Sequence, residues 1–495
     1  EKGVGIWLWY GVNNTGHSGY KDSQGHPAYP YYSLLDEATI KREFERVSGL
    51  GVKGVKVDYY ESDTQETMKQ MYLCATIAAK NKLMVLFHGC TLPRGESRTY
   101  PNVVSFEAIN GTEYYKWFTS PSLENRVSYT FTRNVVGSAD FTPTGIPVLN
   151  SKATAGFALA DVVTIESGLQ HFAHSVYTYE GSSALPFLND VPVVWDDMKV
   201  LDGRPMQFNV TARRSGNNWY IGASTISARK ISVKLSELID DDGTYNAYIF
   251  HDNANGSDLE VTVKNGLTKK DVIEQSLLAN GGCVMKITKG SMKLTTPYSN
   301  YLSYEAEKAK IGGGAKVTDG KDGRYSSGGA YVGYIGGNSR GDVTFENVTA
   351  PADGEYTLRI YYVSGTPRSV KVDVNGAFAT KLDNCYANKN DWTGIAAKNV
   401  QVKLKAGKNT IRLYNDQGDG PSIDRIALAI PNEDVLAGDM NFDGIVNAVD
   451  LTLLKRGLMN GFTGSKEEHA ADFNMDGKKD TADVKSMVLF LTTQA

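Results

Sequence analysis

The sequence predicts a multidomain protein with a partial (β/α)8 TIM barrel, an antiparallel β domain, a jelly-roll β-sandwich and a small α-helical calcium-binding domain. Three observations predict this fold class. The chain has 495 residues, more than a single hydrophobic core usually holds. Residues 1–190 alternate β-branched runs with helical patterns, whereas 191–431 read as short strands separated by Gly, Asn and Asp turns. A twelve-residue pattern of Asp and Asn occurs twice after residue 436.

The composition restricts the function classes. A net charge of −4 with 22 % charged residues gives no electrostatic case for a nucleic-acid partner. The 28 tyrosines suit carbohydrate binding, where flat aromatic faces pack on sugar rings, but they suit any β-sandwich nearly as well. Four cysteines without CxxC spacing predict neither a zinc site nor a disulfide framework. No apolar run reaches the ~20 residues that a membrane-spanning helix needs, so no membrane span is expected.

The first 190 residues carry the strand and helix signals of a parallel βα arrangement. Asp36 is the expected N-cap of the first helix. Expected strands are Val4–Trp9, Val52–Val57, Leu83–Phe87, Val103–Phe106 and the VVTIES run at 162–167, and expected helices cover 36–50, 68–79, 153–160 and a run through Leu169 and Phe172. Together with the loop-rich region that contains SADFTPTG, these five segments are counted as six strand positions of a barrel rather than eight. Because the chain opens on a core strand, we expect that an amino-terminal part of the barrel precedes it.

Charged side chains follow three neighbouring strands. Asp58 ends the strand at 52–57, His88 ends the next, and Glu107 and Glu113 follow the third. Because the carboxyl ends of parallel strands meet at one edge of a sheet, these residues are expected to lie together. Two such carboxylates can hydrolyse a glycosidic bond, one at the anomeric carbon and the other carrying the proton. The alternative is that Asp58 caps the next helix and that both glutamates lie on a solvated surface.

The carboxyl-terminal repeat predicts two calcium loops. Oxygen ligands at positions 1, 3, 5, 9 and 12 wrap a hard cation, and Gly at position 6 permits the sharp turn. An apolar helical pattern follows each loop, which a disordered tail would not show. The predicted side-chain ligands are Asp439, Asn441, Asp443, Asn447 and Asp450 in the first copy, and Asp472, Asn474, Asp476, Asp480 and Asp483 in the second.

This doubled loop resembles a type I dockerin. Aspartate at position 12 and one helix per loop, rather than two, agree with that family. The resemblance implies a cohesin domain of a scaffoldin as partner and an extracellular, cellulosome-bound location. The pairs that precede the last ligand are Ala448 with Val449 and Thr481 with Ala482. Because the two pairs differ, the sequence argues against binding in two orientations.

Residues from about Tyr304 to Ile430 resemble a family 35 carbohydrate-binding module. The motifs are YEAE, GGAYVGYIGG, GEYTLRIYY and NTIRLYN followed by SIDRIAL. The resemblance implies a structural calcium ion held by Glu305, Glu307 and Asp424. It also implies a sugar site among the end loops, for which Tyr334, Trp392 and Asn415 are the candidates, although each could equally be a core or turn residue.

The front of the chain, from Gly3 to about residue 290, resembles glycoside hydrolase family 97. The motifs are VKVDYYESDTQ, FHG, RTYPN, FEAINGTEYYKW, SADFTP, IESGLQ and VPVVWDDMKVLDG followed by ARRSGNNWYIGA. Inverting members carry a glutamate base where this chain has Gly89, whereas retaining members use an aspartate nucleophile at the position of Asp58. The resemblance also implies Glu113 as general acid/base and a calcium ion at Glu107 and Glu113.

Further residues of the same motifs are candidate substrate contacts. These are Lys56, His88 and Trp9. For Lys56 an ion pair in the barrel core is nearly as well supported. The family's amino-terminal β-sandwich and first two βα units have no counterpart in these residues, so low solubility and little activity are expected of them alone.

The combined resemblances imply a secreted, calcium-dependent, retaining exo-glycosidase that cleaves terminal α-galactosides of an oligo- or polysaccharide. An α-glucosidase, a β-L-arabinopyranosidase or a non-catalytic sugar-binding cellulosome subunit are the alternatives. The expected organisation is a catalytic barrel at 1–190, the family 97 carboxyl-terminal β domain at 191–295, the carbohydrate-binding module at 300–431 and the dockerin at 436–493.

Overall fold

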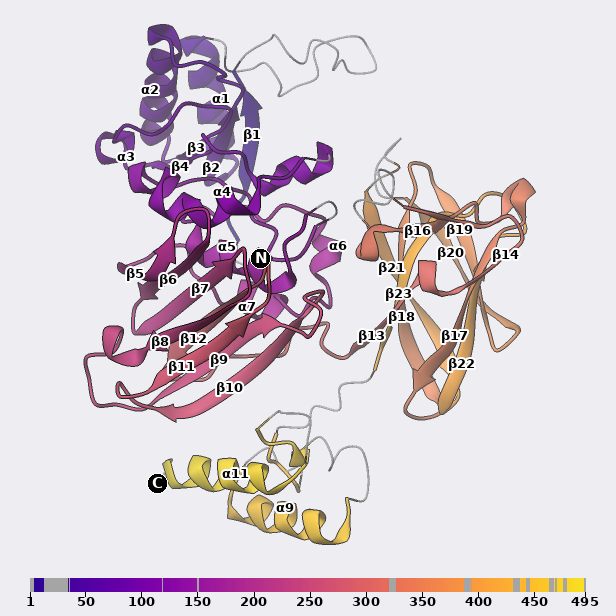
Figure 1. The fold of residues 1–495 in the computed structure, drawn as a ribbon. Coiled ribbons are helices and arrows are strands. Elements are labelled where there is room, and N and C mark those ends of the chain that lie inside the picture. Colours follow the sequence, from indigo (N-terminus) through magenta and orange to yellow (C-terminus); the bar gives the residue numbers. More distant parts are fainter. Residues whose placement is uncertain are drawn as a thin grey trace.

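The computed structural model of this chain describes residues 4–12, 34, 36–117, 119–148, 151–319, 326–386, 392, 394–430, 437–441, 446–462, 467, 470–474 and 479–493. Figure 1 shows, in chain order, an α/β part, an antiparallel β part, a β-sandwich and a pair of helices. The multidomain architecture predicted from the sequence is therefore confirmed.

A four-stranded parallel sheet forms the α/β part. Its strands are β1 (Trp7–Gly11), β2 (Gly54–Asp58), β3 (Met84–Phe87) and β4 (Val103–Phe106), in that spatial order. Helices α1 (Glu37–Gly49) and α2 (Gln65–Lys80) share one hydrophobic core with these strands. As predicted, Asp36 is the N-cap of α1, and its side chain accepts a hydrogen bond from the amide of Thr39. The sheet thus brings the ends of β2, β3 and β4 to one edge.

Four of the six predicted barrel positions form strands of this sheet in the described residues. Beyond β4, Phe106 forms an isolated bridge with Ala139, and the Ala139 amide donates to the carbonyl oxygen of Glu166 at 2.8 Å, so the barrel itself stays a prediction. The predicted strand at 162–167 begins inside helix α5 (Ala155–Thr164), and the residues around Leu169 and Phe172 form no helix. Every residue of α5 is buried, and a helix buried on all sides has the same unbroken apolar run as a buried strand.

The antiparallel part is a six-stranded sheet in the order β10-β9-β12-β7-β6-β5, beside a two-stranded sheet β11-β8. Helix α5 lies directly on the larger sheet. Glycines permit this approach, because a Cβ atom at Gly156 would lie 2.0 Å from the carbonyl oxygen of Gly282. The strands are β5 (Asp197–Arg204), β6 (Phe208–Ser215), β7 (Asn218–Thr225), β8 (Arg229–Lys234), β9 (Tyr245–Asp252), β10 (Leu259–Leu267), β11 (Val272–Leu277) and β12 (Gly282–Thr288). The predicted antiparallel β domain is confirmed.

Two antiparallel sheets form the β-sandwich. One has the order β15-β16-β23-β18-β21 with β13 paired to β23, the other has the order β14-β17-β22-β19-β20, and both contribute to one core. The strands are β13 (Tyr301–Glu305), β14 (Lys310–Gly312), β15 (Lys316–Thr318), β16 (Tyr331–Gly333), β17 (Asp342–Ala350), β18 (Gly354–Val363), β19 (Arg368–Val374), β20 (Ala377–Cys385), β21 (Ile395–Leu404), β22 (Gly407–Tyr414) and β23 (Ser422–Ala429). Jelly-roll connectivity stays a prediction.

The remaining helices complete the described structure. Four short ones are α3 (Glu96–Thr99), α4 (Leu123–Ser128), α6 (Val176–Tyr179) and α7 (Leu185–Leu188). Near the carboxyl terminus, α9 (Ala448–Asn460) and α11 (Thr481–Thr493) pack around Leu454 and Met487, one helix for each predicted calcium loop. Among the described helices, none has the length and apolarity required to cross a bilayer. All four cysteines are free.

Candidate active site

The imidazole of His88 is the centre of the residue cluster at the ends of β2, β3 and β4. Its Nδ1 atom lies 3.2 Å from Oδ1 of Asp58 and 3.3 Å from Oε2 of Glu107. Its Nε2 atom lies 3.4 Å from Oε1 of Glu113, which belongs to a 3-10 helix at Thr112–Trp117, and 3.8 Å from Oδ2 of Asp140. The structure therefore brings together Asp58, His88, Glu107 and Glu113, the four residues that the strand-end argument selects.

Asp58 is held by three donors and is only 8 % exposed. Trp9 Nε1 donates to Oδ2 at 3.0 Å, and the Tyr59 amide, in a left-handed backbone conformation with φ of 67°, donates to Oδ1 at 2.7 Å. Burial alone would raise the pKa of Asp58, but its bonds to His88, Trp9 and Tyr59 outweigh burial and lower that pKa. Because Thr64 is the N-cap of α2, Asp58 does not cap that helix.

Opposing effects act on the other buried groups of the cluster. Burial works to lower the pKa of His88, but the hydrogen bond and charge of Asp58 and the charge of Glu107 outweigh it, so the pKa is raised. Burial raises the pKa of Glu107, although the charge of His88 and the Gly89 amide, which donates to Oε2 at 2.7 Å, oppose that rise. The Glu113 side chain is 21 % exposed, against 8 % for His88, so it is the more accessible of this pair.

The chemistry of the cluster partly fits the predicted calcium ion. One ligand atom from each of His88, Glu107 and Glu113 can be chosen so that all three lie within 4.8 Å of one another. Calcium takes six to eight oxygen ligands, and the two glutamates supply carboxylate oxygens of the right kind. The Nε2 atom of His88 is buried without a hydrogen-bond partner among the described residues. Glu107 and Glu113 therefore fit part of a calcium shell.

Asp140 is a member of the site that sequence reasoning missed. It is fully buried, and its Oδ2 atom pairs with Lys56 Nζ at 2.9 Å, which is the core ion pair considered as the alternative role of that lysine. His171 Nδ1 lies 3.3 Å from both Asp140 oxygens. Burial would raise the pKa of Asp140, but His171, Lys56 and His88 outweigh it and lower the pKa to about 2. The signal in the sequence was the SADFTP motif, which contains both Asp140 and Ala139, the residue that bridges to Phe106.

The predicted sugar-contacting residues of the β-sandwich divide into two kinds. Tyr334 lines a cavity of about 530 Å³ and is 63 % exposed, and Trp392 is 41 % exposed. Arg368 joins them, because it lines the same cavity and its guanidinium lies 4.6 Å from the centroid of the Trp392 ring. Asn415 is buried instead, and its side chain bonds to the backbone of Gln417 and Asp419. Asn415 therefore shapes the loop rather than offering a contact surface.

The acidic groups predicted to hold calcium in the β-sandwich lie close together. Asp424 accepts a hydrogen bond from the amide of Ser327 at 2.9 Å, and Glu305 accepts one from the hydroxyl of the same serine. Burial raises the pKa of Asp424, and repulsion from Glu305 and Glu307 adds to the rise. Oε2 of Glu307 is buried without a partner in the described structure. A cation would relieve this repulsion, so the residues fit the predicted ion.

The last aspartate organises each loop of the carboxyl-terminal repeat. Asp450 is fully buried and accepts hydrogen bonds from the amides of Met440, Asn441 and Asn447 at 2.9 to 3.2 Å. Asp483 accepts the equivalent bonds from the amides of Asn474 and Asp480 at 3.1 and 2.8 Å. The other predicted ligands that the structure describes are Asp439 and Asp472, whereas Asp443 and Asp476 lie outside the described residues. The carboxylate and side-chain amide oxygens of these Asp and Asn residues are ligands that suit a hard cation.

Comparison with protein families gives three matches. Residues 1–109 match the family described as Glycoside hydrolase 97. Residues 194–288 match the family described as Glycosyl-hydrolase 97 C-terminal, oligomerisation. Residues 437–489 match the Dockerin type I domain.

Individual proteins give similar matches. A retaining alpha-galactosidase of Bacteroides thetaiotaomicron is 35 % identical over 307 residues, which is 58 % of this chain and 43 % of the relative. The crystal structure of a beta-arabinopyranosidase is similar with a TM-score of 0.49 at 28 % identity, over 57 % of this chain and 46 % of that one. A family 35 carbohydrate binding module from Clostridium thermocellum gives a TM-score of 0.24 at 32 % identity, over 26 % of this chain and 98 % of that one.

The match to the curated relative has a limited extent. The chain spans less than half the length of that alpha-galactosidase. The family comparisons therefore establish that the chain contains a segment of glycoside hydrolase 97, the carboxyl-terminal domain of that family and a type I dockerin domain.

Proposed function

We propose that the chain is a retaining exo-glycosidase that hydrolyses terminal α-galactosides, with Asp58 as nucleophile and Glu113 as general acid/base. The observation that carries the proposal is the gathering of Asp58, Glu107 and Glu113 around His88 at the carboxyl ends of neighbouring parallel strands. The name of the Bacteroides relative, a retaining alpha-galactosidase, supports the choice of sugar.

The contacts of each carboxyl group suit its proposed step. Asp58 attacks the anomeric carbon through one oxygen, the bond to the leaving oxygen breaks, and Glu113 gives that oxygen its proton. Glu113 then takes a proton from water, which attacks the anomeric carbon and releases Asp58 from the covalent glycosyl-enzyme. The hydrogen bonds from Trp9 and the Tyr59 amide keep Asp58 ionised and oriented before attack.

The backbone at Gly89 supports retention over inversion. This is the position where inverting members of the resembled family carry a glutamate base. Gly89 has a φ of 51°, and a Cβ atom there would lie 3.0 Å from Oδ1 of Asp58 and 3.0 Å from the Tyr59 amide nitrogen. A glutamate at this position would therefore crowd the proposed nucleophile, so the local structure favours an aspartate that attacks directly.

The proposed calcium ion has a defined place in this scheme. Glu107 and Glu113 would hold it, and the bound ion would supply positive charge to polarise the substrate. The amide of Gly89 orients Glu107 through its hydrogen bond to Oε2. Because Glu113 would be one of its ligands, removal of a bound calcium ion should affect the acid/base step as well as substrate binding.

A substrate screen tests the proposal. The 4-nitrophenyl derivatives of α-galactose, α-glucose and β-L-arabinopyranose would be offered to the full chain with calcium and with chelator. We expect the α-galactoside to be cleaved fastest, in the presence of calcium, with the α anomer as the first product seen by proton NMR. Preference for another sugar would leave an α-glucosidase or a β-L-arabinopyranosidase, and a β anomer would exclude retention. Because little activity is expected of these residues alone, only the absence of turnover at high protein concentration would favour a non-catalytic sugar-binding subunit.

Asp140 should act by positioning Lys56. Asp140→Asn removes the charge that pairs with Lys56 at 2.9 Å, so we expect kcat to fall by about 10- to 100-fold, as for other residues that orient an active site. Adding Lys56→Met to Asp140→Asn should then lower kcat little further, because the two side chains act as one unit. The matched control is Asp190→Asn, which breaks the 2.7 Å pair with Lys286 elsewhere in the fold. If the fall in kcat of the double variant equalled the product of the falls in the two single variants, this role would be excluded.

The other parts of the chain are proposed to deliver the enzyme to its substrate. Residues 300–431 would bind sugar through Tyr334 and Trp392 and hold calcium at Glu305, Glu307 and Asp424. Residues 436–493 would bind a cohesin and place the protein outside the cell on a cellulosome, which the dockerin match supports. Residues 1–190 and 191–295 would form the catalytic part and its β domain. Loss of polysaccharide binding in Tyr334→Ala would support the sugar site, and unchanged binding would exclude it.

A further inference from the structure

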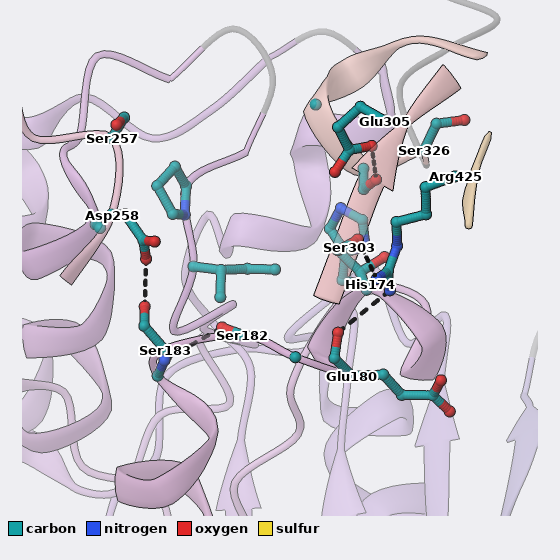
Figure 2. Close-up of a pocket in the computed structure, with 18 of the residues that line it drawn as sticks. His174, Glu180, Ser182, Ser183, Ser257, Asp258, Ser303, Glu305, Ser326 and Arg425 are labelled. Carbon is teal, nitrogen blue, oxygen red and sulfur yellow. Dashed lines mark hydrogen bonds between the residues drawn. The ribbon is translucent and has the colours of Figure 1, made fainter. Parts of the chain in front are cut away.

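A second cavity lies where the α/β part, the antiparallel part and the β-sandwich meet. Its volume is about 520 Å³, which lies within the ~300–1,000 Å³ typical of small-molecule sites. Figure 2 shows Ser183 and Asp258 on one side and Glu305, Ser326 and Arg425 on the other. The residues of the proposed catalytic cluster do not line it. It is therefore a separate place in the molecule.

A partly buried ion pair fixes the wall that joins the β-sandwich to the rest of the chain. Glu180 accepts two hydrogen bonds from Arg359, from Nε at 2.7 Å and from Nη2 at 2.9 Å. The hydroxyls of Tyr361 and Tyr298 donate to the same carboxylate at 2.6 and 3.0 Å. A bidentate pair with two further donors is strong and geometrically specific. The wall is therefore organised before any ligand arrives.

The hydrogen-bonding atoms that line the cavity indicate which kind of ligand it could bind. Asp258 accepts a hydrogen bond from Ser183 through Oδ1, and Glu305 accepts one from Ser327 through Oε2. Their other carboxylate oxygens have no hydrogen bond in the described part of the chain. Arg425 is 5 % exposed, and its Nε atom, 3.9 Å from Oδ2 of Asp424, is a buried donor with no hydrogen bond among the described residues. The cavity thus offers both acceptors and a donor to a bound molecule.

The charges of the cavity exclude an acidic ligand. Arg425 Nη2 is occupied by the backbone oxygens of Tyr177 and Glu180, and Arg359 is occupied by Glu180. With Glu180 paired to Arg359, Asp258 and Glu305 outnumber the one remaining cation, Arg425, so the lining is weakly negative and favours neutral groups that donate hydrogen bonds over anions. The adjacent rings of Tyr298 and Tyr301, with centroids 5.7 Å apart, add aromatic surface on which a sugar ring can pack.

We propose that this junction cavity is an additional binding site for a neutral carbohydrate. Sugar hydroxyls both donate and accept hydrogen bonds, which matches the free carboxylate oxygens and the Arg425 donor. The site would hold one part of a polysaccharide chain where the β-sandwich and the catalytic part are clamped together. The proposal does not depend on which glycoside the enzyme cleaves, because none of the proposed catalytic residues lines the cavity, which shares only Glu305 with the proposed calcium site of the β-sandwich.

Amide hydrogen exchange of the full chain tests this site directly. The background is Asp58→Asn with Tyr334→Ala, which removes the proposed nucleophile and the proposed loop site of the β-sandwich. We expect galactose or raffinose to slow exchange in residues 257–259 and 301–305, and galacturonate to leave it unchanged. Protection at β2 and β4 would report the catalytic site separately, so the two proposals can fail independently.

A pair of tryptophan substitutions, one at the rim of the cavity and one away from it, tests whether sugar binds in the cavity. Ser257→Trp places a bulky ring from an exposed loop at its rim, and should weaken raffinose binding by about tenfold or more, as expected when a central contact is lost. Ser236→Trp, on an exposed serine that does not line the cavity, should leave the affinity unchanged. Unaltered binding in Ser257→Trp, absence of sugar-dependent protection in the unblocked protein, or equal protection by galacturonate would each overturn the proposal.

Discussion

Replacing Asp58 with alanine should reduce kcat for an aryl α-galactoside by a factor on the order of 10⁴ or more, as the loss of a catalytic nucleophile does in other enzymes. The physical reason is that the Trp9 indole, the Tyr59 amide and Nδ1 of His88 hold the Asp58 carboxylate in place, while Nε2 of the same ring lies 3.4 Å from Glu113. Azide fits the space left by the carboxyl group and attacks from the same side, so it should restore turnover and yield the β-galactosyl azide. The measurement is the initial rate with and without azide, with the product anomer assigned by proton NMR.

A nearby aspartate provides the control for this experiment. Asp63 lies in the same segment after β2, but its side chain is 67 % exposed and pairs only loosely with Arg94 at 3.5 Å. Asp63→Ala should therefore keep nearly full activity. Equal activity of Asp58→Ala and the unmodified protein would remove Asp58 from the mechanism, and a loss that matches a fall in melting temperature would assign Asp58 a structural role instead.

Many strands and helices could be predicted from the sequence because their boundaries depend on nearby residues. The strand at Val103–Phe106 was predicted with its observed bounds, and the helix from Glu37 to Gly49 was predicted with its cap at Asp36. The strand-end rule also brought Asp58, His88 and Glu107 together, since it follows from chain direction in a parallel sheet alone. These features need no knowledge of distant contacts.

Long-range pairings could not be predicted in the same way. Lys56 and Asp140 are 84 positions apart, and Glu180 and Arg359 are 179 apart, so no spacing in the sequence joins them. The misassigned strand at 162–167 has the same origin. Helix α5 is apolar on every face because a sheet and neighbouring segments bury it completely, and that burial is a property of the tertiary structure. Sequence patterns therefore identified the proposed carboxylates but not the ion pairs that position their surroundings.

Removing calcium should unfold the carboxyl-terminal repeat while the rest of the described fold stays intact. The repeat has a small core around Leu454 and Met487, and its loops concentrate carboxylates that repel one another without a cation. Binding of the metal and folding are therefore one equilibrium. With EDTA, amide exchange in α9 and α11 should approach that of an unfolded chain, whereas exchange in β6 and β7 should not change. Added calcium should reverse the effect.

Cohesin binding is the functional measurement of the same equilibrium. We expect EDTA to lower the affinity for a type I cohesin by at least about 100-fold, because the docking surface exists only when the metal-bound repeat is folded. Asp450→Ala and Asp483→Ala each remove a buried carboxylate that organises one loop, and calcium should fail to restore the double variant. Asp242→Ala, at an exposed position outside the repeat, is the control and should bind normally. Cohesin binding that persists in EDTA would show that the repeat folds without calcium and would overturn the prediction.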